Sequence, residues 1–248
     1  MTRIFSSLRT TAGRFAVNFA LLALLALVML VSMRFGSLKL TFAEIVGTLW
    51  NRPDGINGQI IFNIRLPRIL LGALVGGSLA AAGTILQGVM RNPLASPGII
   101  GVSAGGGLGG ILVMLVLPQF GYLLVPAAFG GALVTAVLVY LLAWKRGVNP
   151  VRLILAGVAV SAMLGAFSST ILILNAEKAG GVLYFTIGSL SARSWPQIEQ
   201  VAPYMAAGFA VALMLGQKLN ILTLGDEVAT GLGMRVERTR FLLLAVAA

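Results

Sequence analysis

The sequence predicts an all-α protein, a polytopic bundle of transmembrane helices, and three observations support this prediction. First, 58% of the 248 residues are hydrophobic and only 10% are charged, whereas soluble domains carry about 25% charged residues. Second, the apolar residues form runs of about 20 residues, the length of helix that spans a bilayer. Third, the basic residues lie mostly in the short segments between these runs, as in other membrane proteins. We therefore expect one transmembrane domain over residues 1–248.

Six apolar runs are predicted as complete spans, and a seventh begins near the end of the chain. No small-residue cleavage pattern follows the first run, so we interpret it as a helix and not as a signal peptide. Pro67 is expected to fix the entry to the second span, and Pro118 to end the third. The run from Phe241 to Ala248 is too short to cross a bilayer, so we expect a C-terminally truncated bundle. The six spans are Phe15–Met33, Ile69–Met90, Ile99–Leu117, Leu123–Ala143, Leu153–Leu174 and Val201–Leu215.

The distribution of basic residues predicts the orientation. With the N-terminus in the cytoplasm, the inner segments carry more lysine and arginine than the outer ones, as the positive-inside rule requires. The bias is reduced by an unusually basic first outer loop, which must have another reason for its charges. That loop contains Arg34, Lys39, Arg52, Arg65 and Arg68.

Composition also excludes several functions. The chain has no cysteine and no histidine and only seven acidic residues, which leaves no thiolate, imidazole or common zinc site and predicts no cofactor. Residues 105–110 match G-x-G-x-x-G, but they lie inside an apolar run with no strand before them, so we reject a dinucleotide site. The net charge of +11 is assigned to membrane topology and not to nucleic-acid binding.

Glycines and serines recur at intervals of four within the predicted spans. This spacing lets helix backbones approach closely in lipid, so we expect tight packing at these positions. The pairs are Gly72 with Gly76, Gly101 with Gly105, Gly105 with Gly109, Gly106 with Gly110, and the series Gly157, Ser161 and Gly165.

Three features could carry function. Arg65 and Arg68 flank Pro67 at the outer mouth of the second span, where they could anchor the helix at lipid headgroups or pair with acidic groups of an external protein. A rigid turn follows that span and is either structural or a contact for gating or for an inner partner. Its residues are Asn92, Pro93, Leu94, Ala95, Pro97 and Gly98.

The third feature is the inner loop from Lys218 to Arg240. Asp226 and Glu227 suit the first turn of a short helix, and Gly231 or Gly233 could end it. Such a helix outside the membrane is either a plain connection or a docking site for a cytosolic subunit. The segment comprises Gly225, Asp226, Glu227, Val228, Ala229, Gly231, Leu232 and Gly233.

Taken together, these motifs resemble the FecCD-type permeases of bacterial ABC importers, which take up ferric siderophores, haem or cobalamin, and the resemblance covers essentially the whole chain. The residues that carry it are Arg65-Leu66-Pro67-Arg68, Gln87 with Asn92-Pro93-Leu94-Ala95, Pro97-Gly98, Gly101-Val102-Ser103, and Leu224-Gly225-Asp226-Glu227 with Leu232-Gly233.

The resemblance implies the type II ABC importer permease fold and a non-enzymatic transport subunit. It implies three kinds of partner: a second permease subunit, identical or different; two cytoplasmic ATPase subunits; and a periplasmic or lipid-anchored binding protein. In the family, arginines at the positions of Arg65 and Arg68 pair with acidic residues of the binding protein. The loop containing Gly225–Gly233 corresponds to the family's coupling helices, which contact the ATPase.

Two other classes of protein were weighed. An ion-coupled secondary transporter usually carries a charged residue inside a span, and none lies in the interior of the spans predicted above. An intramembrane hydrolase needs a nucleophile and a base, and these spans offer neither histidine, cysteine nor lysine. The favoured function is therefore import of an iron chelate driven by a partner ATPase, with haem or cobalamin as the alternative cargo.

Overall fold

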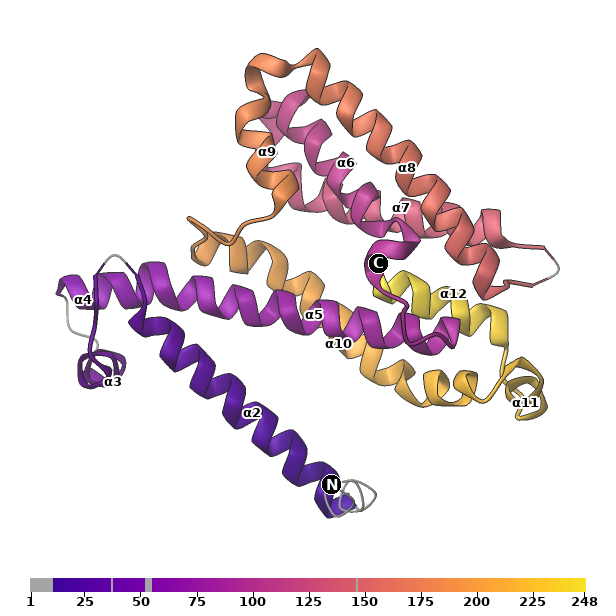
Figure 1. Cartoon of the computed structure of the whole chain (residues 1–248), viewed down its shortest axis with the longest axis horizontal. Coiled ribbons are helices and arrows are strands. Elements are labelled where there is room, and N and C mark those ends of the chain that lie inside the picture. The colour runs from indigo at the N-terminus through magenta and orange to yellow at the C-terminus, as the bar shows by residue number, and fades with distance from the viewer. Residues whose placement is uncertain (1–10, 37, 52–54, 146) are drawn as a thin grey trace. The chain divides into compact units, whose positions relative to one another are not determined.

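The computed structural model describes residues 11–36, 38–51, 55–145 and 147–248, and the regular secondary structure of these residues is helical. The prediction of an all-α fold is confirmed for this part of the chain (Figure 1). Arg3, Arg9 and Arg52, which contributed to the predicted orientation, lie outside the described residues. Five helical stretches are long and apolar enough to cross a membrane: Thr11–Arg34, Ile56–Met90, Pro118–Ala143, Pro150–Leu174 and Trp195–Thr223.

The internal contacts of the chain divide it into two compact units. The first unit comprises residues up to Ala73 together with Leu190–Ile198, and the second comprises Leu74–Ser189 together with Glu199–Ala248. Each unit is described separately below.

The first unit begins with helix α2, Thr11–Arg34, of which only Met33 is buried. Its exposed side chains are almost all apolar, as expected of a helix that faces lipid. Helix α3, Phe42–Asn51, starts at a capping box in which the Glu44 carboxylate accepts hydrogen bonds from the backbone N–H and the hydroxyl of Thr41. The small core of this unit is formed by Met33, Leu40, Ile45 and Ile61.

The second predicted span begins earlier than expected. Helix α4, Ile56–Gln59, continues through a π-helical segment η1, Ile60–Arg65, into α5, Leu66–Met90. Proline has no N–H and its ring collides with the carbonyl four residues earlier in an ordinary α-helix. The wider π turn just before Pro67, with Leu66 N–H bonded to Ile61 O, accommodates the ring. Pro67 therefore lies within a continuous helix, and the prediction that it marks the helix entry is wrong.

The second unit is built around α6, Val102–Leu115, which packs against α7, Leu124–Ala143, and α8, Pro150–Leu174. Helix α6 is shorter than the predicted span Ile99–Leu117, because Gly101 takes a left-handed conformation (φ 77°) between α6 and the 3-10 helix η2, Pro97–Ile100. After α6 come the 3-10 helix η3, Pro118–Leu123, and then α7. After α8 come η4, Ala176–Lys178, and α9, Ala179–Ile187.

Close contact between α6 and α7 explains part of the glycine spacing. A Cβ atom on Gly105 would lie 2.5 Å from the carbonyl oxygen of Gly131, and one on Gly109 would collide with the carbonyl of Ala127. Gly157 on α8 makes a similar approach to the backbone of residues 99–100. The predicted tight packing is confirmed at these positions. Gly76 and Gly165, by contrast, have no neighbouring atom within 4 Å of such a Cβ.

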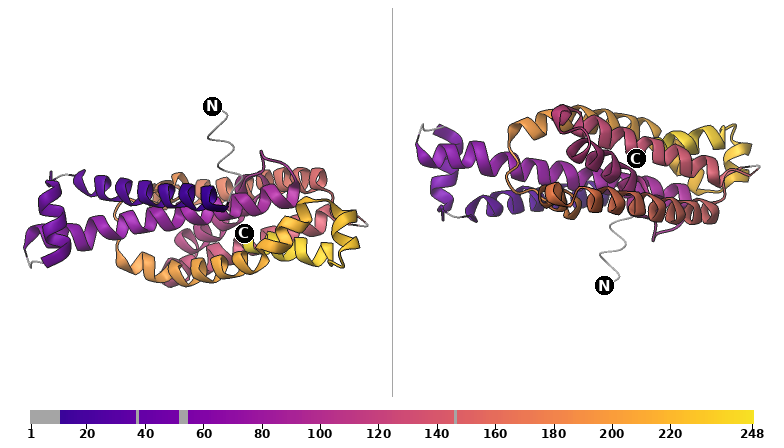
Figure 2. Two further views of the ribbon diagram at one scale, coloured as in Figure 1. Left: turned by 90° about the horizontal axis from the view of Figure 1, so that it is seen from below. Right: turned by 90° about the horizontal axis from the view of Figure 1, so that it is seen from above.

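The last predicted span is longer than expected, and a further helix follows it. Helix α10, Trp195–Thr223, replaces the predicted Val201–Leu215. It is followed by α11, Asp226–Gly231, and α12, Val236–Ala247, which starts before the predicted Phe241. Helices α11 and α12 lie at the same end of this unit as the α7–α8 connection (Figures 1 and 2).

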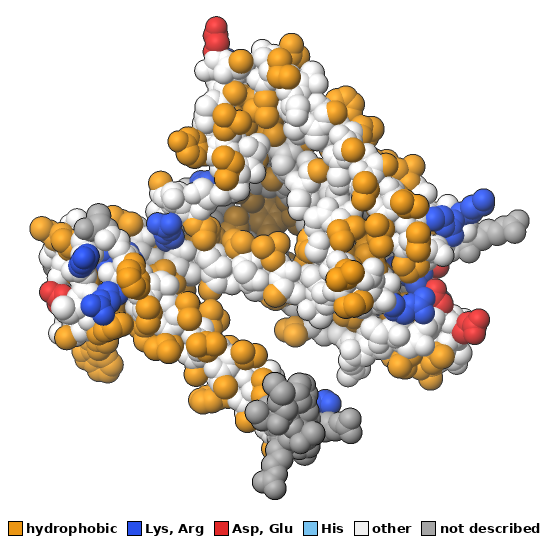
Figure 3. Space-filling model, in the orientation of Figure 1, with side chains coloured by type: hydrophobic (Ala, Val, Ile, Leu, Met, Phe, Trp, Pro, Cys, Tyr) orange, Lys and Arg blue, Asp and Glu red, His pale blue; other side chains and the backbone are white. Residues whose placement is uncertain are grey.

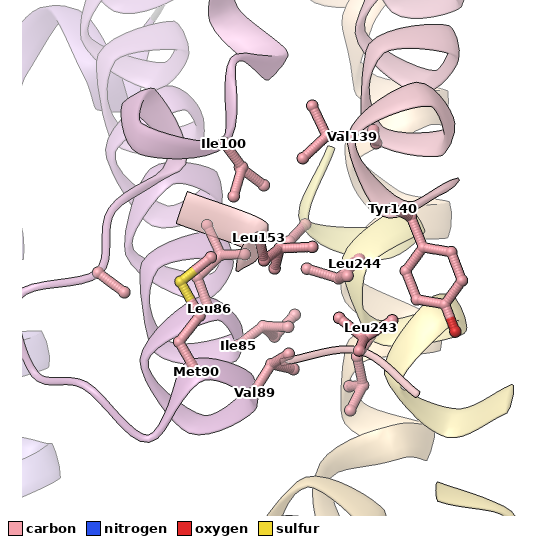
Figure 4. Close-up of a cluster of buried hydrophobic side chains, with 14 of the residues drawn as sticks. Ile85, Leu86, Val89, Met90, Ile100, Val139, Tyr140, Leu153, Leu243 and Leu244 are labelled. Atoms are coloured by element: carbon pink, nitrogen blue, oxygen red, sulfur yellow. The ribbon is translucent and has the colours of Figure 1, made fainter. Parts of the chain in front are cut away.

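The main hydrophobic core of the second unit lies where α5, α7, α8, α10 and α12 meet. Ile85, Leu86 and Val89 of α5 point toward Leu243 and Leu244 of α12 (Figure 4). Leu153, Leu243 and Leu86 are at most 1% exposed. This core packs α12 against α5, α7, α8 and α10.

Candidate functional site

The Arg65 guanidinium is buried inside the first unit and not presented to solvent. Its side chain is 7% exposed, and its two terminal nitrogens donate hydrogen bonds to the carbonyl oxygens of Met33 and Leu38. Met33 O belongs to the last turn of α2, whose carbonyls lack helical partners and carry the negative end of the helix dipole. Arg65 therefore caps α2 and fixes the segment that leads to α3.

Arg68 lies three residues further along the helix and is exposed. The two arginines therefore face different environments, because the Arg65 guanidinium is bonded to main-chain carbonyls. Phe62, near Arg65, accepts a hydrogen bond from the indole N–H of Trp195 at 2.8 Å, which joins η1 to the start of α10 within the same unit.

The turn after α5 has the rigid form predicted from its prolines. The N–H groups of Arg91 and Asn92 bond to the carbonyls of Gly88 and Gln87, the pattern of a Schellman motif. The Asn92 side chain accepts from Leu94 N–H at 2.9 Å, and the Gln87 amide donates to Pro93 O at 3.0 Å. Leu94 is 81% exposed at the tip of this turn, whereas Ala95 is buried. Pro97 and Gly98 then begin η2.

Arg91 adopts a left-handed conformation (φ 50°) at the position of the Schellman motif where glycine is usual. A non-glycine residue there costs about 1 kcal/mol. The Arg91 guanidinium lies 3.5 Å from the Asp226 carboxylate. This contact gives a reason for arginine at a strained position.

The predicted short helix in the inner loop is confirmed as α11. It begins at Asp226 and ends at Gly231, as the acidic residues and the glycine predict. Gly225 (φ 113°) and Gly233 (φ 79°) flank it in conformations that favour glycine. One face is buried through Ala229, which is 0% exposed, and the other presents Leu224, Val228 and Leu232, which are 49–63% exposed.

A group of charged and polar side chains ties α11 to its surroundings. Both carboxylate oxygens of Asp226 accept from Arg240 Nη2, at 2.8 and 3.0 Å. Arg240 Nη1 donates to Val148 O at 3.2 Å and to Glu237 Oε1 at 3.3 Å. Glu237 in turn accepts from the Tyr140 hydroxyl at 3.2 Å. The Arg240 side chain is 1% exposed, and acidic and basic side chains gather at this end of the unit (Figure 3).

The second unit also contains a cavity of about 580 Å³, lined by α5, α6, α7, α10 and the last residues of α12. The hollow and its hydrophobic walls are visible in Figure 3. Its polar groups include the hydroxyls of Ser78, Ser103 and Tyr204, and no charged side chain belongs to its described lining. Such walls suit apolar groups.

Comparison with known proteins decides the family. The sequence model of the FecCD transport family matches residues 24–248. The chain belongs to the FecCD transport family. Its motifs thus occur in the family that the sequence indicated, and the identification made from those motifs is confirmed.

Several relatives of this FecCD chain carry names that state a cargo. It is 38% identical over 213 residues to the Fe(3+)-citrate import system permease protein YfmE of Bacillus subtilis, covering 82% of this chain and 64% of the relative. It is 44% identical over 190 residues to the cobalamin import system permease protein BtuC of Halobacterium salinarum, covering 76% and 51%. The chain thus spans about half to two thirds of the length of these relatives.

A solved structure supports the same fold. It is described as an inward-facing conformation of an ABC transporter of the metal-chelate type. It matches this FecCD chain with a TM-score of 0.81 and a sequence identity of 30%. The match covers 94% of this chain and 72% of the chain in that structure. The predicted fold class, a transmembrane helix bundle of the ABC importer permease type, is confirmed. The five membrane-length helices and this relationship make the chain a multi-pass membrane protein.

Sequence reasoning missed the network around Arg240. The i, i+3 spacing of Glu237 and Arg240 is visible in the sequence and suggests a pair on one helix face. The residues that bond to this pair, Asp226, Tyr140 and Val148, come from three other segments of the chain. No local sequence pattern connects them to Glu237 or Arg240.

Proposed function

We propose that this chain is the membrane-spanning permease subunit of an ABC importer and does no chemistry itself. Membership of the FecCD transport family over residues 24–248 is the observation that carries the proposal. ATP hydrolysis by two cytoplasmic ATPase subunits would supply the energy, and a second permease copy, identical or different, would complete the path. The whole of residues 1–248 would then act as one permease domain in a bacterial inner membrane, with the N-terminus in the cytoplasm.

The proposed cargo is an iron chelate. The names of several relatives support this choice, including Fe(3+)-citrate and iron(3+)-hydroxamate permeases of Bacillus subtilis and the ferric enterobactin permease FepG of Escherichia coli. Cobalamin is the alternative, supported by the 44% identity to BtuC of Halobacterium salinarum, and haem is a further alternative.

On the outer side, we propose that Arg65 and Arg68 serve docking of the substrate-binding protein in different ways. The exposed Arg68 would pair with an acidic side chain of that protein. The buried Arg65 would act by holding the loop at Met33 and Leu38 in place. Charge reversal at Arg68 should weaken stimulation of ATPase activity by the loaded binding protein. A simple lipid anchor would leave that stimulation unchanged.

On the inner side, we propose that α11 docks on the ATPase and that the turn with Leu94 lies close to the same partner. The exposed apolar residues Leu224, Val228 and Leu232 would form the contact, since exposed apolar groups on an extramembrane helix suit a protein interface. A cysteine at Val228 should crosslink to the ATPase. A cysteine at Ala229, which is buried on the opposite face, is the matched control and should not.

Transport in proteoliposomes tests the proposal as a whole. The full-length permease is reconstituted with its ATPase and binding protein, and uptake of ferric citrate, a ferric hydroxamate, haem or cobalamin is measured. Uptake should require ATP inside and binding protein outside. Uptake driven by a proton or sodium gradient without nucleotide would instead identify an ion-coupled secondary transporter.

A further inference from the structure

We propose that Arg240 is a positioning residue that clamps the coupling helix α11 to the membrane helices. This inference rests on the proposed function, in which α11 receives the force from the ATPase. In this proposal a group of charged and polar side chains transmits that force. We call this group the clamp, and its members are Asp226, Arg240, Glu237, Tyr140 and Arg91.

The main chain alone cannot hold α11 in a fixed orientation. The helix has six residues, far fewer than the number at which an isolated helix is stable in water. Gly225 and Gly233 flank it with φ values of 113° and 79°, so neither connection is stiffened by a Cβ atom. A push on the exposed side of α11 would swivel the helix about these two glycines unless side chains prevented it.

Two contacts oppose such a swivel. One is the packing of Ala229, which is 0% exposed and belongs to the main core. The other is the ion pair in which Arg240 Nη2 donates to both carboxylate oxygens of Asp226, at 2.8 and 3.0 Å. The Nη1 of the same planar guanidinium is bonded to Val148 O and Glu237, so the position of the group is fixed and Asp226 is held against it.

Arg240 and its two carboxylate partners reach three places besides α11. Its Nη1 donates to Val148 O in the α7–α8 connection at 3.2 Å. Its neighbour Glu237 accepts from Val148 N–H at 3.3 Å and from the Tyr140 hydroxyl at the end of α7 at 3.2 Å. Arg91 at the end of α5 approaches Asp226 from the other side at 3.5 Å. Movement of α11 therefore has a polar route to α7, to the α7–α8 connection and to the turn that follows α5.

The charges of the clamp suit a rigid connection. Two arginines face two carboxylates, so the group is neutral overall, and the innermost member, Arg240, is 1% exposed. A buried guanidinium tolerates no loss of its carboxylate partners. The strained left-handed conformation of Arg91 is consistent with the same role, since strain is retained where surrounding structure requires it.

The first test measures the mobility of α11 and does not depend on transport. Amide hydrogen exchange of residues 226–231 is compared in the full-length protein and in its Arg240→Met, Arg240→Lys and Asp226→Asn variants. We expect exchange to accelerate about tenfold or more in Arg240→Met and Asp226→Asn, as loss of a charge-assisted hydrogen bond implies. Arg240→Lys should be intermediate because one ammonium group cannot replace the two guanidinium nitrogens that bond Asp226 and Val148 separately.

The matched control is Arg238→Met, which removes an exposed arginine from the same helix and should leave the exchange unchanged. Asp226→Asn preserves the shape of a residue whose side chain is 43% exposed, so it remains informative where Arg240→Met fails to fold. Exchange within twofold of the control in both Arg240→Met and Asp226→Asn would overturn the clamp.

The second test measures coupling in the reconstituted importer, as substrate molecules moved per ATP hydrolysed. We expect this ratio to fall at least about fivefold in Asp226→Asn, because α11 yields instead of moving the membrane helices. An unchanged ratio would show that the pair does not transmit force. Failure of the unaltered protein to import with ATP would instead refute the proposed function, and the exchange measurement would still decide whether α11 is clamped.

Discussion

Replacement of Arg65 by methionine should destabilise the protein far more than the same replacement of Arg68. Arg65 donates to Met33 O and Leu38 O and is 7% exposed, and a hydrogen bond to a charged group contributes about 1.5–3 kcal/mol. Leu38 is 41% exposed, so water can replace the arginine at its carbonyl. Met33 is 4% exposed, so its carbonyl is left without a partner. We therefore expect a net loss of about 3 kcal/mol.

The assay is thermal unfolding of the purified full-length protein in detergent. A loss of about 3 kcal/mol corresponds to a decrease in Tm of about 6–12 °C for a chain of this size. Arg68→Met removes an exposed side chain and should change stability by less than about 0.5 kcal/mol. Arg65→Lys should fall between the two, since one ammonium group cannot serve two separated carbonyls as a guanidinium does.

The reasoning would be refuted if Arg65→Met and Arg68→Met unfolded at the same temperature. A second measurement separates the structural role from docking. Arg68→Glu should reduce the affinity for the binding protein without lowering Tm. If Arg65→Met lowered that affinity while Tm stayed unchanged, the guanidinium would contact the partner directly and would not act by capping α2.

Two further outcomes follow from the described contacts. Gly131→Ala should lower Tm, because the new Cβ would collide with the carbonyl oxygen of Gly105. Gly130→Ala is the control: its Cβ would meet no atom within 4 Å, so Tm should stay the same or rise. Equal Tm values for the two variants would contradict the close approach of α6 and α7. The pKa of Glu44 lies below its usual value of 4.5 because the carboxylate accepts hydrogen bonds from the Thr41 backbone and hydroxyl. The Glu44 cap should therefore stabilise α3 above about pH 4.5, and this stabilisation should be lost as the pH falls through the lower pKa of the folded state. A carboxyl ¹³C titration should show the lowered pKa of Glu44, and Thr41→Ala should bring it closer to its usual value.

Much of the helical architecture could be predicted from the sequence. In lipid, every backbone polar group has to be satisfied within its own segment, so an uncharged apolar run of sufficient length has helix as its only stable form. The first span and the span from residue 123 to Ala143 agree with α2 and α7 to within a few residues. The start of α11 at Asp226 was also predictable, because acidic residues in a first turn and glycines at both ends act locally.

The positions of individual side chains were not predictable in this way. Arg65 and Arg68 are equivalent in the sequence, and only the folded loop places the carbonyls of Met33 and Leu38 within reach of one of them. The π turn before Pro67 and the left-handed Gly101 likewise changed helix bounds without any signal strong enough to locate them. Both are local adjustments that depend on what packs against the backbone.

The sequence by itself determined that this chain is a helical membrane protein, because its composition and its long apolar runs leave no other stable fold. The motifs that resemble those of FecCD permeases were also visible in the sequence, because each consists of residues close together in the chain. Only the tertiary structure decided that Asp226 faces inward to Arg240 while Val228 and Leu232 face outward. The physical reason is that ion pairs, hydrogen bonds and a buried core join segments that are far apart in the chain, such as Tyr140 and Glu237. Such long-range contacts produce no periodic pattern in the sequence from which they could be predicted.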